Sequence, residues 1–242
     1  MLLRRVIDHV EQQNWTALGL DFLIVVSGVF IGVQLGNWNA ALQTQAAFEE
    51  AQQRLVTETQ ANVEITDAYL ADVAARSAHV HKAIEQLRAC GTDDVSLEQI
   101  TIGAQVIQGT PTLRLQMTNL PAITKNDQFV ALLSAQERER LMSFERRLLQ
   151  AQKTLDWLEE RPFTNHIENA PHVGFGESVE IPNTGGLTVR RLALTAPLTE
   201  VCQDKRFLAP FYLWERTAVF QTLRGREVRG WLLERLEQSS TP

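Results

Sequence analysis

Helix-breaking residues are missing from a long part of this 242-residue chain, because residues 40–89 contain neither proline nor glycine. Their absence excludes tight turns and predicts one helix of about fifty residues, with Gly91 suited to a left-handed turn at its end. Apolar and small residues recur along it at alternating intervals of three and four, which is typical of a helix–helix seam or a coiled coil. These residues are Val56, Val63, Leu70, Val73, Ser77, Val80, Ile84 and Leu87.

Ionisable residues are missing from a second stretch, Phe22 to Leu35. The apolar run around it extends from Trp15 to Trp38, and as a helix it would be about 35 Å long at roughly 1.5 Å per residue. That length spans a hydrocarbon core of about 30 Å, and the two tryptophans fall at its ends, where indole rings prefer the headgroup level. We therefore predict a transmembrane helix over residues 15–38.

A cleaved signal peptide is the alternative, because Arg4 and Arg5 provide a basic start. Trp38 interrupts the small-residue pattern that a cleavage site needs, and the apolar run is long for a signal peptide, so we expect a retained anchor. The next basic residue after the span is Arg54. The positive-inside rule then places residues 1–14, an amphipathic segment, in the cytoplasm and the rest of the chain in the periplasm of a bacterium.

Three glycines, Gly28, Gly32 and Gly36, are spaced by four within the apolar run. On a helix they form one flat stripe that allows a second helix to approach closely in lipid. Glycine is common in transmembrane helices, which is the simpler explanation, but three glycines in register favour a packing face. The expected partners are the lipid bilayer and either a second copy of this chain or another membrane protein.

The chain also lacks the motifs of common catalytic sites. It has no Walker loop, no dinucleotide-binding fingerprint and no nucleophile elbow, and its net charge of −6 gives no nucleic-acid signal. His79 and His81 lie about 200° apart around a helix axis, so they cannot share a metal ion. His166 and His172 fall in a loop with two glutamates nearby, which is more typical of a solvated loop than of a zinc site. We expect no enzymatic activity, no cofactor and no metal.

Cysteine is scarce: the chain has Cys90 and Cys202, and both fall on the predicted outer side. An oxidising compartment allows a disulfide between them. Two buried thiols and bonds to a partner chain stay open as alternatives, because the sequence does not give the short Cα separation that a disulfide requires.

Capping signals and helix breakers predict shorter elements after the long helix. A capping box that begins at Ser96 opens a helix to about Gln108, and residues 112–124 are expected to be irregular or to form a short helix with a turn. The next helix begins at Asn126 or Asp127 and restarts at Ser134, where a second capping box begins. Its apolar stripe, which precedes the terminating Pro162, consists of Leu133, Leu141, Phe144, Leu148, Ala151, Leu155 and Leu158.

The last third of the chain changes character. In residues 172–195, β-branched residues flank the sequence PNTGG, which predicts a small β-hairpin that packs on the bundle or on another subunit. The last helix is predicted from about Asp204 to Gln238, with a disordered tail at residues 239–242. Its apolar stripe consists of Phe207, Phe211, Trp214, Ala218, Gly225, Val228, Leu232 and Leu236.

The N-terminal sequence RRVIDHVEQQNW, followed by LDFLIVVSGVFIGVQLGNWN, is similar to the start of an uncharacterised family of bacterial single-pass inner-membrane proteins, a domain of unknown function. Members carry a hydrophobic helix that ends in a glutamine, a small residue and Asn-Trp-Asn, which here are Gln34, Gly36 and residues 37–39. The similarity is specific over residues 4–39 and weaker over two later blocks. It implies the membrane topology and a helical outer domain, and it implies no activity.

The sequence therefore predicts a mainly α protein. One N-terminal transmembrane helix is followed by an extracytoplasmic antiparallel helical bundle over residues 39–238, with a β-hairpin insertion. The first functional hypothesis is a non-enzymatic interaction or scaffold protein that self-associates or serves as an accessory subunit of a larger membrane complex. The alternative is a periplasmic ligand-binding or sensory bundle, which would need a partner protein for signalling because only about fourteen residues lie inside.

Overall fold

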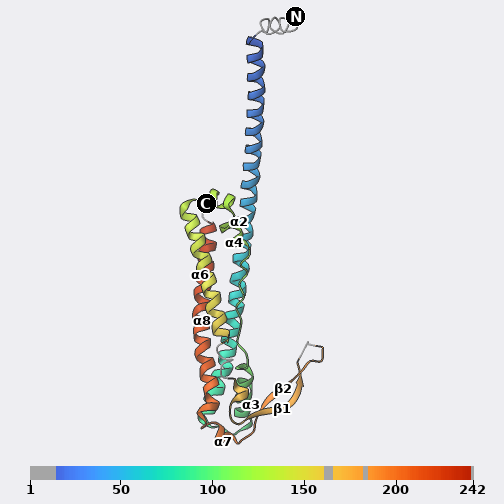
Figure 1. Ribbon diagram of the computed structural model, residues 1–242. Coiled ribbons are helices and arrows are strands. Elements are labelled where there is room, and N and C mark those ends of the chain that lie inside the picture. The colour runs from blue at the N-terminus through green and yellow to red at the C-terminus, as the bar shows by residue number, and fades with distance from the viewer. Residues whose placement is uncertain (1–14, 161–165, 182–184, 241–242) are drawn as a thin grey trace.

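One helix organises the structure, a computed structural model that describes residues 15–160, 166–181 and 185–240 (Figure 1). This helix, α2 (Trp15–Ala89), has 75 residues and is about 110 Å long at roughly 1.5 Å per residue. Its first part extends alone, and from Phe48 onward it packs against the rest of the chain. The other elements are α3 (Asp94–Val106), α4 (Asn119–Thr124), α5 (Asp127–Leu132), α6 (Ala135–Glu160), η2 (Ile167–Asn169), β1 (Val173–Glu180), β2 (Thr188–Leu194), α7 (Leu198–Val201) and α8 (Lys205–Ser240).

Three long helices, α2, α6 and α8, form a bundle in which α2 enters from above in the view of Figure 1. After α3 the chain returns to the upper end of the bundle as an extended segment, residues 109–118, and α6 then descends beside it. As a result α6 runs parallel to α2, while α8 runs antiparallel to both. The prediction of an antiparallel bundle is therefore correct for α8 and wrong for α6, because an extended return segment takes the place of a fourth helix.

The end of α2 confirms the predicted boundary and corrects the predicted cap. Cys90 has φ 49°, and Gly91 donates its N–H to the Gln86 carbonyl at 3.3 Å, which together form a left-handed helix cap. Cys90, and not Gly91, is the left-handed residue. Gly91 is needed for another reason, since a Cβ at this position would collide with the side chain of Ser96 and lie 3.3 Å from Gln86 Oε1.

The start of α3 corrects a second capping prediction. The N-cap is Asp93, whose carboxylate accepts hydrogen bonds from the Ser96 N–H at 3.0 Å and from the Ser96 hydroxyl at 2.7 Å. These bonds lower the pKa of Asp93. Ser96 therefore lies in the first turn of the helix and does not cap it.

Most other sequence predictions of secondary structure are confirmed. Asn126 caps α5, and the Ser134 hydroxyl accepts the Glu137 N–H at 3.1 Å at the start of α6. Every predicted stripe residue of α6 is buried, as are most of those in α8. The last helix continues through Ser240, beyond the predicted end at Gln238, so Ser239 is helical and not disordered. Pro162 lies outside the described residues.

The buried face of α2 divides into two halves of different chemistry. In the lower half the predicted seam is correct, and Val73, Val80 and Leu87 are fully buried. In the upper half Val56, Val63 and Leu70 are only half-buried. Beside Phe48, Ala51, Leu55 and Tyr69, four polar residues are buried there: Glu58, Thr59, Asn62 and Thr66, at 6% exposure or less.

Thr59 and Thr66 donate to carbonyl groups of their own helix, whereas Glu58 and Asn62 bond the extended segment, whose backbone has no helix or sheet to satisfy it. The Asn62 amide donates to the Gln116 carbonyl and accepts the Gln116 N–H, both at 2.8 Å. The Glu58 carboxylate accepts three hydrogen bonds, each 2.9 Å long, from the backbone N–H groups of Thr118 and Asn119 and from the Asn119 amide. Side chains of α2 thus replace the strand partner that the segment lacks.

The other two long helices hold the same segment. Gln152 of α6 donates to the Leu113 carbonyl at 2.8 Å, and on α8 the Trp214 indole N–H donates to the Gly109 carbonyl at 3.0 Å. Gln221 adds a bond of 3.3 Å to the Pro111 carbonyl. The segment is therefore tied to all three helices and forms part of the core.

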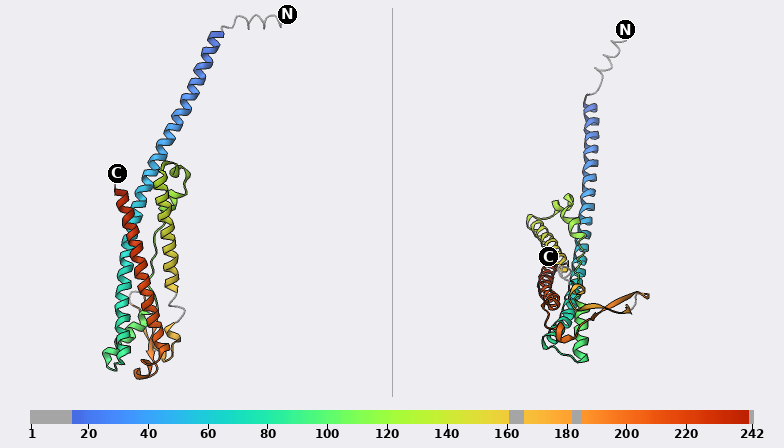
Figure 2. Two further views of the ribbon diagram at one scale, coloured as in Figure 1. Left: turned by 90° about the vertical axis from the view of Figure 1, so that its left-hand side faces the viewer. Right: turned by 60° about the horizontal axis from the view of Figure 1, so that its bottom comes forward.

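The predicted hairpin is present, and Gly185 and Gly186 in its loop have φ of 70° and 93°, values that other residues rarely adopt. Its base packs on the bundle, where Leu192 is 7% exposed. The strands lead away from the helices in Figure 1 and in the right view of Figure 2, and Leu187 and Val189 at their far end are exposed. The prediction that the hairpin packs on the bundle is therefore confirmed for its base alone.

Close packing of α3 on α2 leads to a first testable prediction. A Cβ at Gly103 would collide with the Cβ of Ala83, which is fixed to the backbone of α2 and cannot move aside. We expect Gly103→Ala to lower the free energy of unfolding by about 1–3 kcal/mol through overpacking. The control is Gly230→Ala in α8, where a Cβ meets no atom within 4 Å. The control should raise stability by roughly 0.5–1 kcal/mol, since alanine favours helix, and destabilisation of both variants alike in urea unfolding would contradict the assignment.

Candidate functional site

The apolar side chains of α2 that the structure describes, from Leu20 onward, are exposed. Eleven large apolar residues between Leu20 and Leu35 are each at least 48% exposed, and Trp38 is 64% exposed. Within the described residues α2 is the one helix long and apolar enough to cross a membrane, with a mean hydropathy of 1.4 in its most apolar window. None of that window is buried against the chain itself, which distinguishes it from the core helix of a soluble protein.

The glycine stripe lies within this exposed stretch. A Cβ placed on Gly28, Gly32 or Gly36 would meet nothing within 4 Å. No contact within this chain therefore accounts for glycine at these positions. Of the residues predicted at the membrane interface, Trp38 is placed on this helix, while Arg4, Arg5 and the side chain of Trp15 lie outside the described residues.

The two cysteines, 112 positions apart in the sequence, are joined by a disulfide with a Cα separation of 5.6 Å. Of the three alternatives for Cys90 and Cys202, the structure has the intrachain bond. The bond links the end of α2 to α7 and the start of α8. Beside it, Asp204 bonds the side chain and the backbone N–H of Arg206, which lowers the pKa of this carboxyl group.

The histidines do not assemble into a metal site in the described part of the chain, where no group of three or more potential ligands is present. His79 is exposed, and His81 lies 3.3 Å from Glu85. His172 lies 3.5 Å from Asp204, and His166 pairs with Glu168. The two histidines thus lie beside different carboxylate groups.

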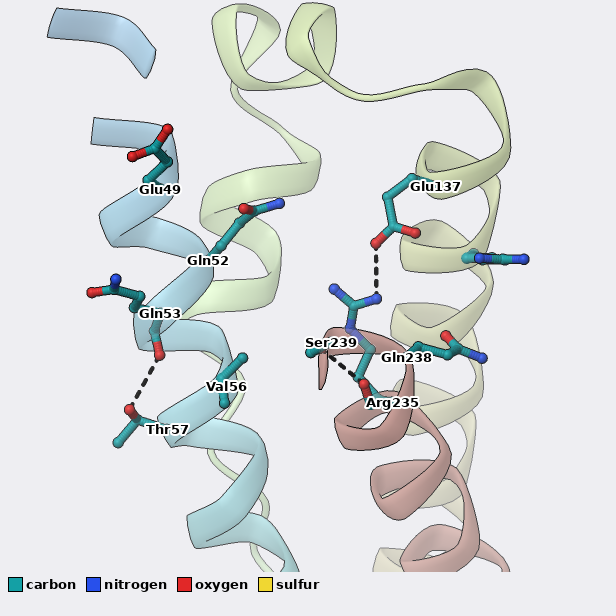
Figure 3. Close-up of a pocket in the computed structure, with 10 residues that line it drawn as sticks. Glu49, Gln52, Gln53, Val56, Thr57, Glu137, Arg235, Gln238 and Ser239 are labelled. Carbon is teal, nitrogen blue, oxygen red and sulfur yellow. Dashed lines mark hydrogen bonds and ion pairs between the residues drawn. The ribbon is translucent and has the colours of Figure 1, made fainter. Parts of the chain in front are cut away.

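A cleft of about 780 Å³ opens at the upper end of the bundle, between α2 on one side and α6 with α8 on the other (Figure 3). Gln52 and Val56 line it from α2, Glu137 and Arg140 from α6, and Arg235 from α8. Figure 3 shows the guanidinium group of Arg235 directed toward Glu137, and their Nη1 and Oε1 atoms are 2.8 Å apart. The side chain of Arg235 is only 11% exposed.

Sequence reasoning did not find this cleft. Its residues come from three helices that are far apart in the sequence, and each of them is an ordinary polar residue for a helix surface. The sequence indicates partial burial only for Arg235, because this residue lies next to Leu236 of the predicted apolar stripe of α8. The positions of Arg140 and Gln52 depend on the tertiary arrangement.

Comparisons with known proteins add no family: no family model matches the chain, and neither a curated protein nor a solved structure is significantly similar to it. The candidate site therefore rests on three features of the described residues. These features are the exposed apolar helix with its glycine stripe, the disulfide, and the polar cleft.

Proposed function

We propose that this chain is a single-pass membrane protein whose outer domain serves as a non-enzymatic interaction module, held at a fixed height by one continuous helix. The observation that carries the proposal is the exposure of the apolar part of α2 in the same helix whose later part is core. Exposed apolar area of this extent is stable in lipid and unstable in water.

The proposed orientation has the N-terminus in the cytoplasm of a bacterium and the bundle in the periplasm. Two independent features support it. Arg4 and Arg5 precede the apolar segment, as the positive-inside rule requires for a cytoplasmic N-terminus. The bond between Cys90 and Cys202 suits an oxidising compartment, and the periplasm is one.

Self-association is the form of interaction that we propose. The glycine stripe continues to Ala40 at the same spacing of four residues, and Ala40 is exposed. A stripe of small residues suits two parallel α2 helices in close contact in lipid.

A second prediction follows for this stripe. Gly32→Ile fills the stripe with a branched side chain and is expected to weaken self-association by about tenfold or more. The measurement is the mass of the full chain in mild detergent and in lipid nanodiscs over a range of dilutions. Val33→Ile adds a smaller change on another face of the same turn and should leave the mass distribution of the wild type unchanged.

The same measurement separates the two versions of the proposal. An oligomer of one chain type that dissociates in the Gly32→Ile variant supports self-association. A stoichiometric foreign membrane subunit would instead assign the chain an accessory role. An oligomer whose size and dissociation do not respond to Gly32→Ile would rule out the glycine stripe as its interface.

A further inference from the structure

The cleft at the upper end of the bundle has a structural origin in the packing of α2 against α8. The two helices are in close contact at Gly225, where a Cβ would lie 2.8 Å from Leu70 Cδ2 and 3.2 Å from Tyr69 Cε1. From this point they diverge toward the upper end, as the left view of Figure 2 shows. The space between them is lined by side chains that do not fill it, which leaves the cleft of about 780 Å³. That volume lies within the range of small-molecule sites, about 300–1,000 Å³.

Two arginines give this cleft its chemistry. Arg235 is 11% exposed, and its ion pair with Glu137 uses one of its five N–H donors; its buried Nε has no hydrogen-bond partner in the described structure. Arg140, on the wall that α6 provides, forms no ion pair within the described part of the chain. Burying a guanidinium group with so few partners costs free energy, and an anion that accepts from both arginines offsets that cost.

The rest of the lining favours an organic anion over a bare ion. Gln52 presents an amide group from the opposite wall, and Val56 adds an apolar surface beside it (Figure 3). Glu49, the other acidic residue of the lining, accepts a hydrogen bond of 2.9 Å from Gln45 of its own helix. A ligand with one anionic group, a short carbon chain and a group that bonds an amide matches these surfaces.

We propose that this cleft binds a small organic molecule with a carboxylate or phosphate group, held by Arg140 and Arg235 on one wall and by Gln52 on the other. Arginine suits this role because its planar fork of donors matches carboxylate and phosphate oxygens. The proposal goes beyond the interaction role of the protein, because it assigns a ligand site to the bundle that is independent of the glycine stripe.

The experiment is calorimetric titration of the full chain in detergent at fixed ionic strength with three probes: glycerol 3-phosphate, succinate and, as a neutral probe, glycerol. We expect saturable binding of glycerol 3-phosphate or succinate and none of glycerol. Arg140→Gln changes an exposed residue and keeps the fold, and it should weaken binding by about tenfold or more. Arg235→Lys keeps the charge but removes the fork, so it should weaken binding to a similar extent.

The matched control is Arg226→Gln, which removes an exposed arginine of α8 that does not line the cleft. Its affinity for the anionic probe should equal that of the wild type. Saturable binding of neither anion overturns the proposal, and so does an equal loss of affinity in Arg226→Gln and Arg140→Gln, because that result would indicate a general charge effect. Binding that distinguishes the two anions identifies the ligand as a phosphate or a carboxylate.

Discussion

Replacing Cys90 and Cys202 together by serine is expected to lower the free energy of unfolding of the bundle by about 2–5 kcal/mol. The reason is the length of chain that the bond closes, since the two cysteines are 112 positions apart. In the chain-entropy description, a bond that closes a loop of roughly 100 residues restricts the unfolded state by about 4.7 kcal/mol. The bond also fixes the end of α2 to the start of α8, so its loss should destabilise both helices.

The measurement is urea unfolding of the full chain in detergent, followed by circular dichroism, for the double serine variant and for the wild type with and without a reductant. Reduced wild type retains both sulfur atoms and controls for the change of side chain. We expect it to unfold at nearly the same urea concentration as the double variant. If oxidised and reduced wild type unfold alike, the bond between Cys90 and Cys202 does not stabilise the fold.

The pH of that comparison matters because two carboxyl groups lie close to the cysteines in the sequence. Hydrogen bonds from Ser96 lower the pKa of Asp93, and those from Arg206 lower that of Asp204. A carboxyl group with a lowered pKa in the folded state adds stability above its ordinary pKa, and the addition is lost as the pH falls through the lowered value. The measurement is therefore made at neutral pH, where both contributions are complete.

The parts of the fold that the sequence predicted are those governed by local signals. Ser134 and Asn126 cap helices because a short polar side chain before an apolar repeat satisfies free backbone N–H groups. The absence of proline and glycine from residues 40–89 predicts a single helix there, and the structure has one. The two wrong caps are local as well: Cys90 stands next to Gly91 at the end of α2, and Asp93 precedes Ser96 by three residues at the start of α3.

The parts that the sequence did not predict depend on one non-local element, the extended segment of residues 109–118. It takes the place of a helix between α2 and α6, so it reverses the direction of α6 relative to the expectation. It also requires polar partners on helix faces, which turns Glu58 and Asn62 into core residues. A search for apolar repeats cannot find such a face, because its residues have the composition of a solvent-exposed surface.

The polar face of α2 leads to the second large prediction. Glu58→Ala is expected to lower the free energy of unfolding by about 2–4 kcal/mol, because hydrogen bonds to a charged acceptor contribute about 1.5–3 kcal/mol each and are not additive. The carboxylate accepts three such bonds, and its side chain is 6% exposed. Removal leaves the N–H groups of Thr118 and Asn119 without their acceptor.

Glu64→Ala is the matched control, because Glu64 is an exposed residue of the same helix and should change stability by no more than about 0.5 kcal/mol. Amide hydrogen exchange of Thr118 and Asn119 gives a second and more local measurement. Both amides should exchange faster in Glu58→Ala and at the wild-type rate in Glu64→Ala.

Unchanged exchange in Glu58→Ala would mean that the extended segment is held by α6 and α8 alone, and that the buried carboxylate of α2 has another purpose. Faster exchange would establish that α2, the helix that reaches into lipid in our proposal, also fixes the path of the chain through the bundle.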